Sequence, residues 1–343
     1  MNRRLARMAL LPALAATLAG CGVSDRVVGL HDAPVEQVDG APMSEQTAQV
    51  IVTRVLGQAD KAFAASDKNT SAREAVLIGP ALRLAAVAQK YEVSSDLASL
   101  TTPATPQILA ISEGREWPRS ILATSRAGDV QRLHLLISDA PTAPYKLWVT
   151  APMVPGSKLP ALPPLAQGTT FADQGDDDRG LVADPVAVFT AYGRLIDSPR
   201  DKKQAAKAAK VVNGNDLYAK AVRASSVAQV EALGSLGTFR RHHGVVTKDI
   251  ATVRLADGSA LAFGQMVRTD RLQPTSKAKQ LDLPSDLARL AGERSVTKSL
   301  DLDWLLTLVA VIPAKDEAHI VGASEQLREV AADEVKRDAK RTK

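Results

Sequence analysis

The sequence lacks several features that mark common classes of protein. Cysteine occurs once among 343 residues, so the chain cannot form an internal disulfide and has too few thiols for a cysteine-based metal site. No apolar run reaches the ~20 residues that a transmembrane helix needs. The formal charge of +5 includes three arginines near the start, and the remaining surplus of +2 is too small to indicate nucleic acid binding.

The start of the chain has the pattern of a lipoprotein signal peptide. Three arginines precede a stretch of 12 mostly apolar residues: Arg3, Arg4 and Arg7, then Met8–Ala19. The stretch runs into a lipobox made of Leu18, Ala19, Gly20 and Cys21. The small residues fit the processing enzymes, and the thiol can form a thioether with a diacylglycerol. We predict that Cys21 becomes the acylated first residue of the mature chain.

This prediction places the protein at the outer face of the cell membrane, with the lipid bilayer as a partner. Two or three acyl chains give stable anchoring, whereas a single chain gives marginal binding. In a host with two membranes, the protein would be periplasmic or face the outer membrane. The alternatives are an ordinary secretory signal cut near Ala19 and an uncleaved signal anchor.

The rest of the chain divides into segments of different composition. We predict a signal peptide over 1–20, a tether over 21–43, a first α+β domain over 44–152, a linker over 153–183, a second α+β domain over 184–332 and a charged tail over 333–343. The tether and the linker contain prolines and lack hydrophobic periodicity. After the signal peptide 323 residues remain, more than one typical core holds.

In both predicted domains the helices come first and the strands follow. Ser44 is the expected N-cap of a helix that ends near Ser66, and Asp184 with Pro185 begins the second domain. Residues 81–93 fit a helix or a strand, and further helical segments are expected at 201–210 and 216–236. The expected strands are 107–112, 119–125, 130–138, 145–150, 244–255, 259–269, 303–312 and 318–329. This order predicts an α+β class in which each antiparallel sheet curves over its helices.

Two short segments carry a resemblance to a known family. Gly79-Pro80-Ala81-Leu82 follows the first helix, and Trp117-Pro118-Arg119 opens a strand. Together with the lipobox and the repeated order of elements, they make residues 44–332 resemble a family of actinobacterial lipoproteins. That family is similar to a tandem of nuclear-transport-factor-2-like (cystatin-like) domains, which are cone-shaped α+β folds. The resemblance implies a fold and a location, and it supplies no activity and no catalytic residues.

A cone-shaped domain can hold an enzymatic pocket in which an aspartate base works beside a phenolic or acidic hydrogen-bond donor. The candidate donors are the tyrosines Tyr91, Tyr145, Tyr192 and Tyr218. Nothing in the sequence pairs one of them with a particular carboxylate, and packing in a core or at a rim is the competing interpretation. Because no glycine-rich phosphate loop, Gly-x-Ser-x-Gly elbow or Ser-x-x-Lys pattern in a suitable setting is present, we assign no catalytic residue.

The histidines do not form a metal-binding pattern, and we predict no metal and no cofactor. His242 and His243 are adjacent, so in a strand their side chains point to opposite faces. The others are isolated, with His31 in the tether and His134 and His319 in expected strands.

Two charged segments have competing interpretations. Asp173 and 176–178, with Gly180, suggest a calcium loop, but the ligand spacing fails and a solvated linker is favoured. Four lysines of one helical segment could contact anionic lipids or wall polymers, or could form a solvated helix face: Lys202, Lys203, Lys207 and Lys210.

The sequence favours a non-enzymatic envelope lipoprotein that binds a protein partner or a small hydrophobic or cell-wall ligand. Binding would depend on shape complementarity and apolar burial, with the lipid raising the local concentration. One alternative is an isomerase- or dehydratase-type enzyme with a pocket in one cone. The other is a structural accessory subunit of an envelope complex.

Overall fold

The computed structural model describes residues 40–64, 70–90, 105–172 and 180–333. These described residues belong to one compact unit. The class is mixed α+β, with 29% helix and 40% strand, and the sheets of the described residues are not closed. This confirms the predicted class at that level.

The described residues of the first half form three helices and a four-stranded antiparallel sheet. The helices are α2 (Glu45–Ala64), α3 (Thr70–Glu74) and α4 (Gly79–Lys90), and the strands β1 (Gln107–Ile111), β2 (Arg119–Ala127), β3 (Val130–Ser138) and β4 (Lys146–Pro152) are paired in chain order. Ser44 caps α2, because its Oγ accepts the amide of Thr47 at 3.2 Å. The segment after Gly79, which fitted a helix or a strand, is helical.

Three of the described helices in the second half pack on a larger sheet. The helices are α5 (Pro185–Ile196), α6 (Lys202–Ala208) and α7 (Leu217–Leu233). The sheet order is β5-β7-β8-β11-β12-β6, from β5 (Phe171–Ala172), β6 (Val212–Asn213), β7 (Gly237–Arg254), β8 (Ala260–Pro274), β11 (Ser299–Ile312) and β12 (Ala318–Asp333). As predicted, Asp184 caps α5, since its carboxylate accepts the amide of Ala187 at 2.7 Å.

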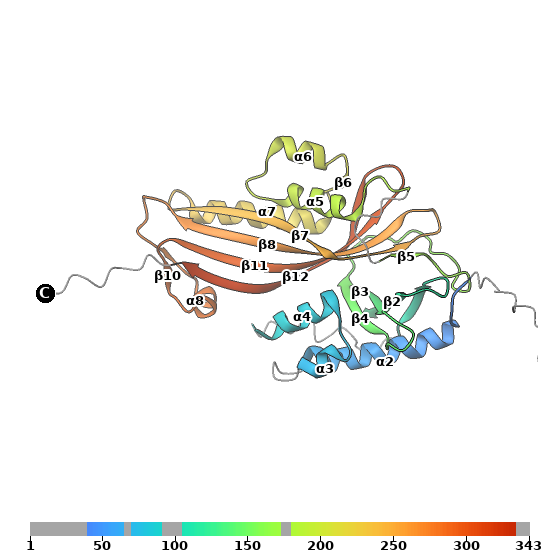
Figure 1. Cartoon of the computed structure of the whole chain (residues 1–343). Helices are drawn as coiled ribbons and strands as arrows, with labels where there is room; N and C mark the ends of the chain where they lie inside the picture. The colour runs from blue at the N-terminus through green and yellow to red at the C-terminus, as the bar shows by residue number, and fades with distance from the viewer. Residues whose placement is uncertain (1–39, 65–69, 91–104, 173–179, 334–343) are drawn as a thin grey trace, which may run out of the picture. The chain divides into compact units, whose positions relative to one another are not determined.

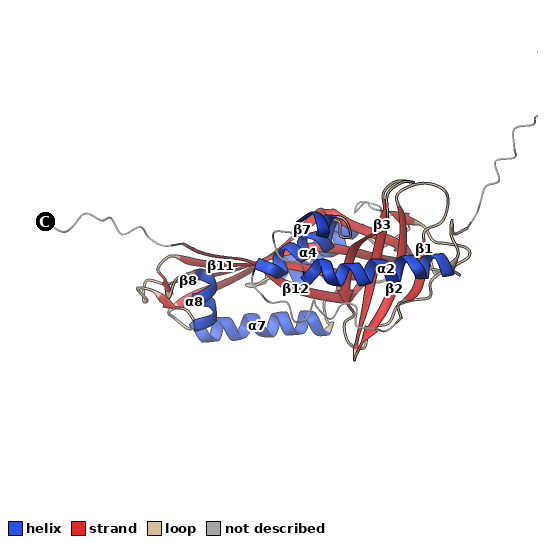
Figure 2. Ribbon diagram, turned by 90° about the horizontal axis from the view of Figure 1, so that it is seen from below, coloured by secondary structure: helices blue, strands red, loops and turns tan. Residues whose placement is uncertain are grey.

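The elements are arranged as helix, sheet, sheet and helix layers (Figures 1 and 2). One core lies between α2, α4 and the four-stranded sheet, and includes Val52 and Leu136. A second core joins the two sheets, with Leu135 of β3 and Phe263 of β8 among its members. A third lies between the six-stranded sheet and α5–α7. Each sheet is therefore covered on both faces over part of its area.

Helix α5 lies close to β8 because that strand carries a glycine at the contact. A Cβ atom added to Gly264 would come within 2.5 Å of Cε2 of the Phe189 ring. Phe189 is fully buried, together with Val188 and Tyr192 on the same helix face. This packing fixes the helical layer to which the polar cluster described below belongs.

Within the predicted linker over 153–183, the described residues 153–172 pair with strands of both halves. Thr169 forms a parallel bridge with Ser112, and β5 pairs with β7. The amide of Val154 donates to the carbonyl of Val321 at 2.8 Å. The division of the chain into two domains at this segment stays a prediction.

A small subregion after β8 was not expected from the sequence. It consists of β9 (Leu281–Asp282), α8 (Ser285–Ala291) and β10 (Ser295–Val296), with β9 and β10 paired antiparallel. Its core includes Val296, Leu300 and Leu327. These elements are short, so hydrophobic periodicity gives little signal over their length.

Candidate functional site

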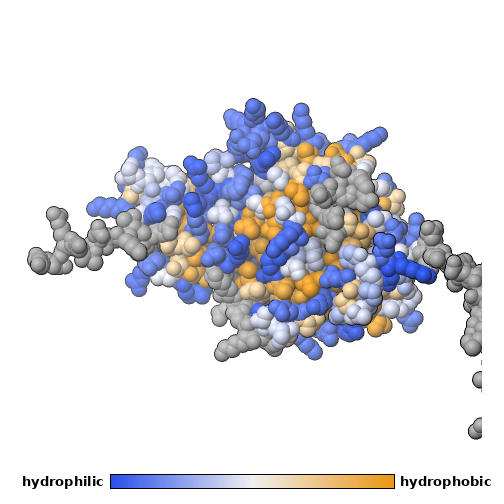
Figure 3. Space-filling view, viewed as in Figure 1, coloured by the Kyte–Doolittle hydropathy of each residue, from blue (hydrophilic) through white to orange (hydrophobic). Residues whose placement is uncertain are grey.

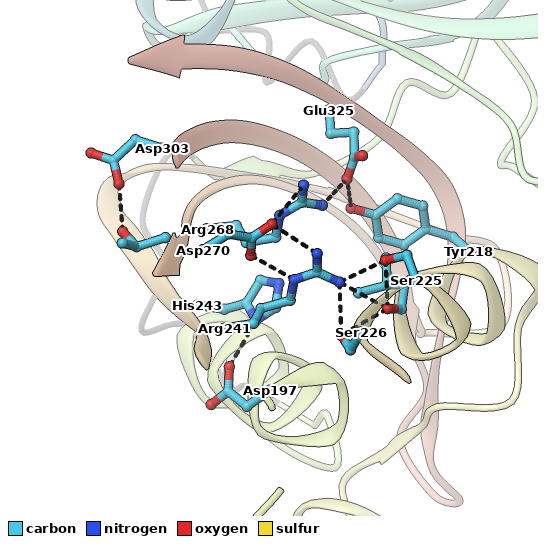
Figure 4. Close-up of polar contacts among 12 residues, drawn as sticks. Asp197, Tyr218, Ser225, Ser226, Arg241, His243, Arg268, Asp270, Asp303 and Glu325 are labelled. Atoms are coloured by element: carbon cyan, nitrogen blue, oxygen red, sulfur yellow. Dashed lines mark hydrogen bonds and ion pairs between the residues drawn. The ribbon is translucent and has the colours of Figure 1, made fainter. Parts of the chain in front are cut away.

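A buried polar cluster lies between α7 and the six-stranded sheet (Figure 4). Arg241 of β7 and Asp270 of β8 are directly opposite each other in the antiparallel ladder. The guanidinium donates twice to the carboxylate, from Nε to Oδ1 at 2.6 Å and from Nη2 to Oδ2 at 2.7 Å. Both side chains are almost fully buried, so water does not compete for this bidentate pair.

The same arginine connects α7 to the sheet. Its Nη1 donates to the carbonyl oxygen of Val222 at 2.8 Å and to the hydroxyls of Ser225 and Ser226 at 2.9 Å each. Burial alternates along the start of β7, which brings Arg241 and His243 to the helix-covered face. All three guanidinium nitrogens of Arg241 therefore have acceptors.

A second arginine extends the cluster toward β12. Arg268 of β8 lies 3.3 Å from Asp270, forms an ion pair with Glu325 and stacks on the Trp304 ring, 4.5 Å from its centroid. The Tyr218 hydroxyl of α7 donates to the Glu325 carboxylate at 2.9 Å. Burial, followed by the Glu325 charge, raises the pKa of Tyr218 well above its ordinary value, so the phenol stays a donor.

His243 lies beside these arginines and pairs with a carboxylate from α5. Its Nδ1 is 2.7 Å from Oδ1 of Asp197, the C-cap residue of that helix. Burial lowers the pKa of His243, although Asp197 opposes the shift. Its Nε2 is buried and has no hydrogen-bond partner within the described residues. His242 is largely exposed, as expected for the adjacent strand position, and lies 3.5 Å from the other Asp197 oxygen.

Two of the candidate tyrosines are paired with carboxylates. In addition to the Tyr218–Glu325 contact, the hydroxyl of Tyr192 lies 3.0 Å from each carboxylate oxygen of Asp216. Burial and the Asp216 charge raise the pKa of Tyr192. Tyr145 has a buried hydroxyl without a partner in the described residues, and burial raises its pKa to about 12. Tyr91 lies outside the described residues.

An open cleft of about 430 Å³ lies at the beginning of α7. Asp216 and Lys220 from the helix region line it, together with Asn213, Ser157 and His319. Asp216 also caps α7, because its Oδ1 accepts the amide of Ala219 at 2.8 Å. The Tyr192 hydroxyl therefore contacts a carboxylate that already has a capping role at the edge of this cleft.

A separate buried histidine lies in the four-stranded sheet. His134 has its Nε2 2.7 Å from the Ser125 hydroxyl and its Nδ1 3.0 Å from the Thr150 hydroxyl. Complete burial, and secondarily the charge of Arg132, lowers the pKa of His134 to about 3. The arrangement differs from a catalytic triad, because a threonine hydroxyl stands where a triad has a carboxylate.

Most of the titratable side chains described above bind other groups of the protein itself. Asp270 and Glu325 accept from arginines, Asp216 caps a helix, and Asp197 binds a histidine. This arrangement couples helices to the sheet and keeps charged groups paired in a region shielded from water. Its clearest physical effect is to hold α7 in a fixed position on the sheet.

Several sequence candidates lie outside the described residues. They are the lipidation residue Cys21, its lipobox neighbours Leu18, Ala19 and Gly20, His31, and the acidic residues Asp173 and 176–178. Among described residues, no group of three or more metal-ligating side chains is present. In the same ranges, no helix has the length and apolar character needed to cross a membrane.

Comparison with known proteins returns no relative. No family model, curated protein or solved structure matches the chain.

Proposed function

We propose that the protein is a lipid-anchored lipoprotein outside the cytoplasm that binds a partner and does not catalyse a reaction. Its anchor would be acylated Cys21, supported by the lipobox at 18–21. Its folded part would be two tandem cone-shaped, nuclear-transport-factor-2-like domains. The order of helices before an antiparallel meander in both halves supports that arrangement.

The outward face of α7 is the observation that carries the binding proposal. Among its 17 residues, 11 are exposed, and seven of these are alanine, valine or leucine. Leu217 is 54% exposed, Val227 56% and Val230 48%. Exposed apolar faces of this kind favour contact with another protein. The Arg241 contacts beneath the helix hold this face rigid, which lowers the entropy lost on binding.

A photoreactive amino acid at Val227 is expected to crosslink a partner in intact cells. The matched control is Val50 on α2, which is 66% exposed and has the same side chain. Val227→Asp should abolish the crosslink from a probe at Val230, because a carboxylate cannot enter an apolar interface without desolvation. Val50→Asp should leave it unchanged. Equal crosslinking from Val227 and Val50 would contradict the proposal that the exposed face of α7 binds the partner.

Cys21→Ser is expected to remove the lipid anchor. The serine hydroxyl cannot form the thioether, so metabolic labelling with an alkyne fatty acid should fall to background, and the signal peptide should stay attached. Intact mass and detergent phase partitioning measure both effects. If the variant is still cut near Ala19 and the parent chain carries no acyl label, the segment is an ordinary secretory signal.

The Tyr192–Asp216 contact supports an alternative function, an isomerase- or dehydratase-type enzyme. Such chemistry uses a carboxylate beside a phenolic donor, and Asp216 lines the cleft at the start of α7. Two features weigh against this alternative: Tyr192 is fully buried, and Asp216 is engaged in capping α7. A structural accessory role in an envelope complex is the third possibility, and it would use the same α7 face.

A further inference from the structure

Positive charge is concentrated in one short part of the helical layer. Residues 194–210 contain six arginines and lysines and two aspartates. The whole chain has a formal charge of +5, of which +3 belongs to the predicted signal peptide and +4 to this segment, so the remainder carries −2. The chain thus has a basic surface that its overall composition conceals.

The cations of this segment are exposed, and no described residue forms an ion pair with them. All six are exposed, and none forms an ion pair within the described residues: Arg194, Arg200, Lys202, Lys203, Lys207 and Lys210. Both aspartates are engaged elsewhere, since Asp197 pairs with His243 and Asp201 accepts the amide of Gln204 as the N-cap of α6. The acids of the segment therefore neutralise little of this surface.

Helix α6 contributes little to the hydrophobic core, and its lysines have no packing role. Its buried residues are Ala205 and Ala208, and the rest of the helix is exposed. The helix lies at the outer side of the helical layer (Figure 1). The space-filling view shows hydrophilic side chains over this helix (Figure 3). Lys203 and Lys207 are four positions apart, a spacing at which like charges repel on one helix face. The local repulsion is a cost without a compensating contact inside the described structure.

We propose that α6 and its flanking arginines dock on an anionic membrane surface. This inference rests on the proposed lipid anchor, because the anchor brings the surface within reach. The chain between Cys21 and Asp39 can span at most roughly 60 Å when fully extended. Tethering at that distance raises the effective concentration of the membrane surface around the folded part, so that even a weak electrostatic contact between the two is populated.

The membrane is the occupant that the chemistry favours. A basic residue next to an anionic leaflet improves partitioning about fivefold, and clusters of roughly four to eight lysines and arginines are typical of segments that bind anionic headgroups. The attraction extends about one Debye length, ~8 Å at physiological ionic strength, so it acts only on a surface held close by. Exposed lysines with flexible stems suit a fluid array of headgroups, because no single geometry is required.

Amine labelling of the full, lipidated chain in vesicles tests the proposal. The protein is reconstituted in phosphatidylcholine vesicles with or without one-third phosphatidylglycerol, and lysine modification is read by mass spectrometry. Modification of Lys202, Lys203, Lys207 and Lys210 should fall about tenfold on the anionic vesicles and recover at high salt. Lys277 and Lys279, which are also exposed, should react equally on both vesicles.

Two further arms separate the possible outcomes. Flotation with the neutral vesicles tests the anchor alone. If the chain fails to float, the proposed lipidation is wrong, and the docking of the basic segment is tested separately by the labelling. Replacing the four lysines by glutamine should remove the difference between vesicles, whereas K277Q/K279Q should retain it. Equal labelling of the parent chain on both vesicles overturns the docking proposal. Protection in isolated cell envelopes but not on anionic vesicles also overturns it, in favour of a wall polymer.

Discussion

Arg241→Ala is expected to lower the free energy of unfolding by about 3–5 kcal/mol, the range observed when one partner of a buried ion pair is removed. The substitution leaves the buried Asp270 carboxylate with Arg268 alone, at 3.3 Å. It also removes the donor to Val222, Ser225 and Ser226, which loosens α7. Denaturant unfolding of the full chain, followed by tryptophan fluorescence, measures the change.

The same sheet offers a matched control in a different environment. Arg271 and Asp301 are also directly opposite on neighbouring strands, and their two hydrogen bonds measure 2.7 and 2.5 Å. The Arg271 side chain is 49% exposed, whereas Arg241 is 3% exposed. Arg271→Ala should therefore cost about 1 kcal/mol or less, because water replaces the lost partner. If Arg241→Ala and Arg271→Ala lower the free energy of unfolding by similar amounts, burial does not determine how much the pair contributes.

Replacing both members of the buried pair tests a second consequence. Arg241→Met combined with Asp270→Leu should recover much of the stability lost in Arg241→Ala, since no uncompensated carboxylate remains. The double variant should nevertheless lose the Val227 crosslink described above, because the hydrogen bonds from Arg241 to Val222, Ser225 and Ser226 of α7 are gone. The double variant would then be stable but would not bind the partner. If it keeps both its stability and the Val227 crosslink, α7 is positioned by its apolar contacts.

The sequence predicts those elements whose signals are local. The caps Ser44 and Asp184 lie within three residues of the amides that they bind. The sequence predicts a strand that begins at Gly244, whereas β7 begins at Gly237. The missed part alternates buried and exposed side chains, but two of its buried positions are Arg241 and His243, which a hydrophobicity pattern does not count.

The polar cluster could not be predicted because its partners are distant in sequence. Arg241 and Asp270 are 29 positions apart, and Tyr218 is 107 positions from Glu325. Pairing a tyrosine with a carboxylate therefore required the strand register, which the sequence does not specify over such separations. No local signal marked the pair either, because Arg241 and Asp270 both lie outside the predicted strands 244–255 and 259–269.

A fall in pH is expected to destabilise the protein through His134. Its folded-state pKa of about 3 lies below the ordinary 6.5, so the folded protein keeps the ring neutral while the unfolded chain takes up a proton. The stabilisation is complete above pH 6.5 and is lost as the pH falls toward 3. Between pH 6.5 and 4.5, this one group should reduce the free energy of unfolding by about 2 kcal/mol.

His134→Gln isolates that contribution. The amide can still bond to the hydroxyls of Ser125 and Thr150 but does not titrate, so the variant should lose less stability than the parent chain between pH 6.5 and 4.5. His242→Gln is the control, because that side chain is 79% exposed. Asp60 acts in the opposite direction, since burial raises its pKa to about 6 and its protonation favours the folded state as the pH falls.

The contributions of other titrating groups to the pH dependence of stability cancel when the parent chain is compared with His134→Gln. Asp60 and the other two histidines with lowered pKa values, His243 and His319, are present in both the parent chain and His134→Gln. The difference between the two pH profiles therefore belongs to His134 and its neighbours. A parallel pair of profiles would mean that His134 is protonated without cost in the folded protein. In that case the sheet must admit water or a counter-charge at Ser125 and Thr150, and the buried network would be less rigid than its hydrogen bonds imply.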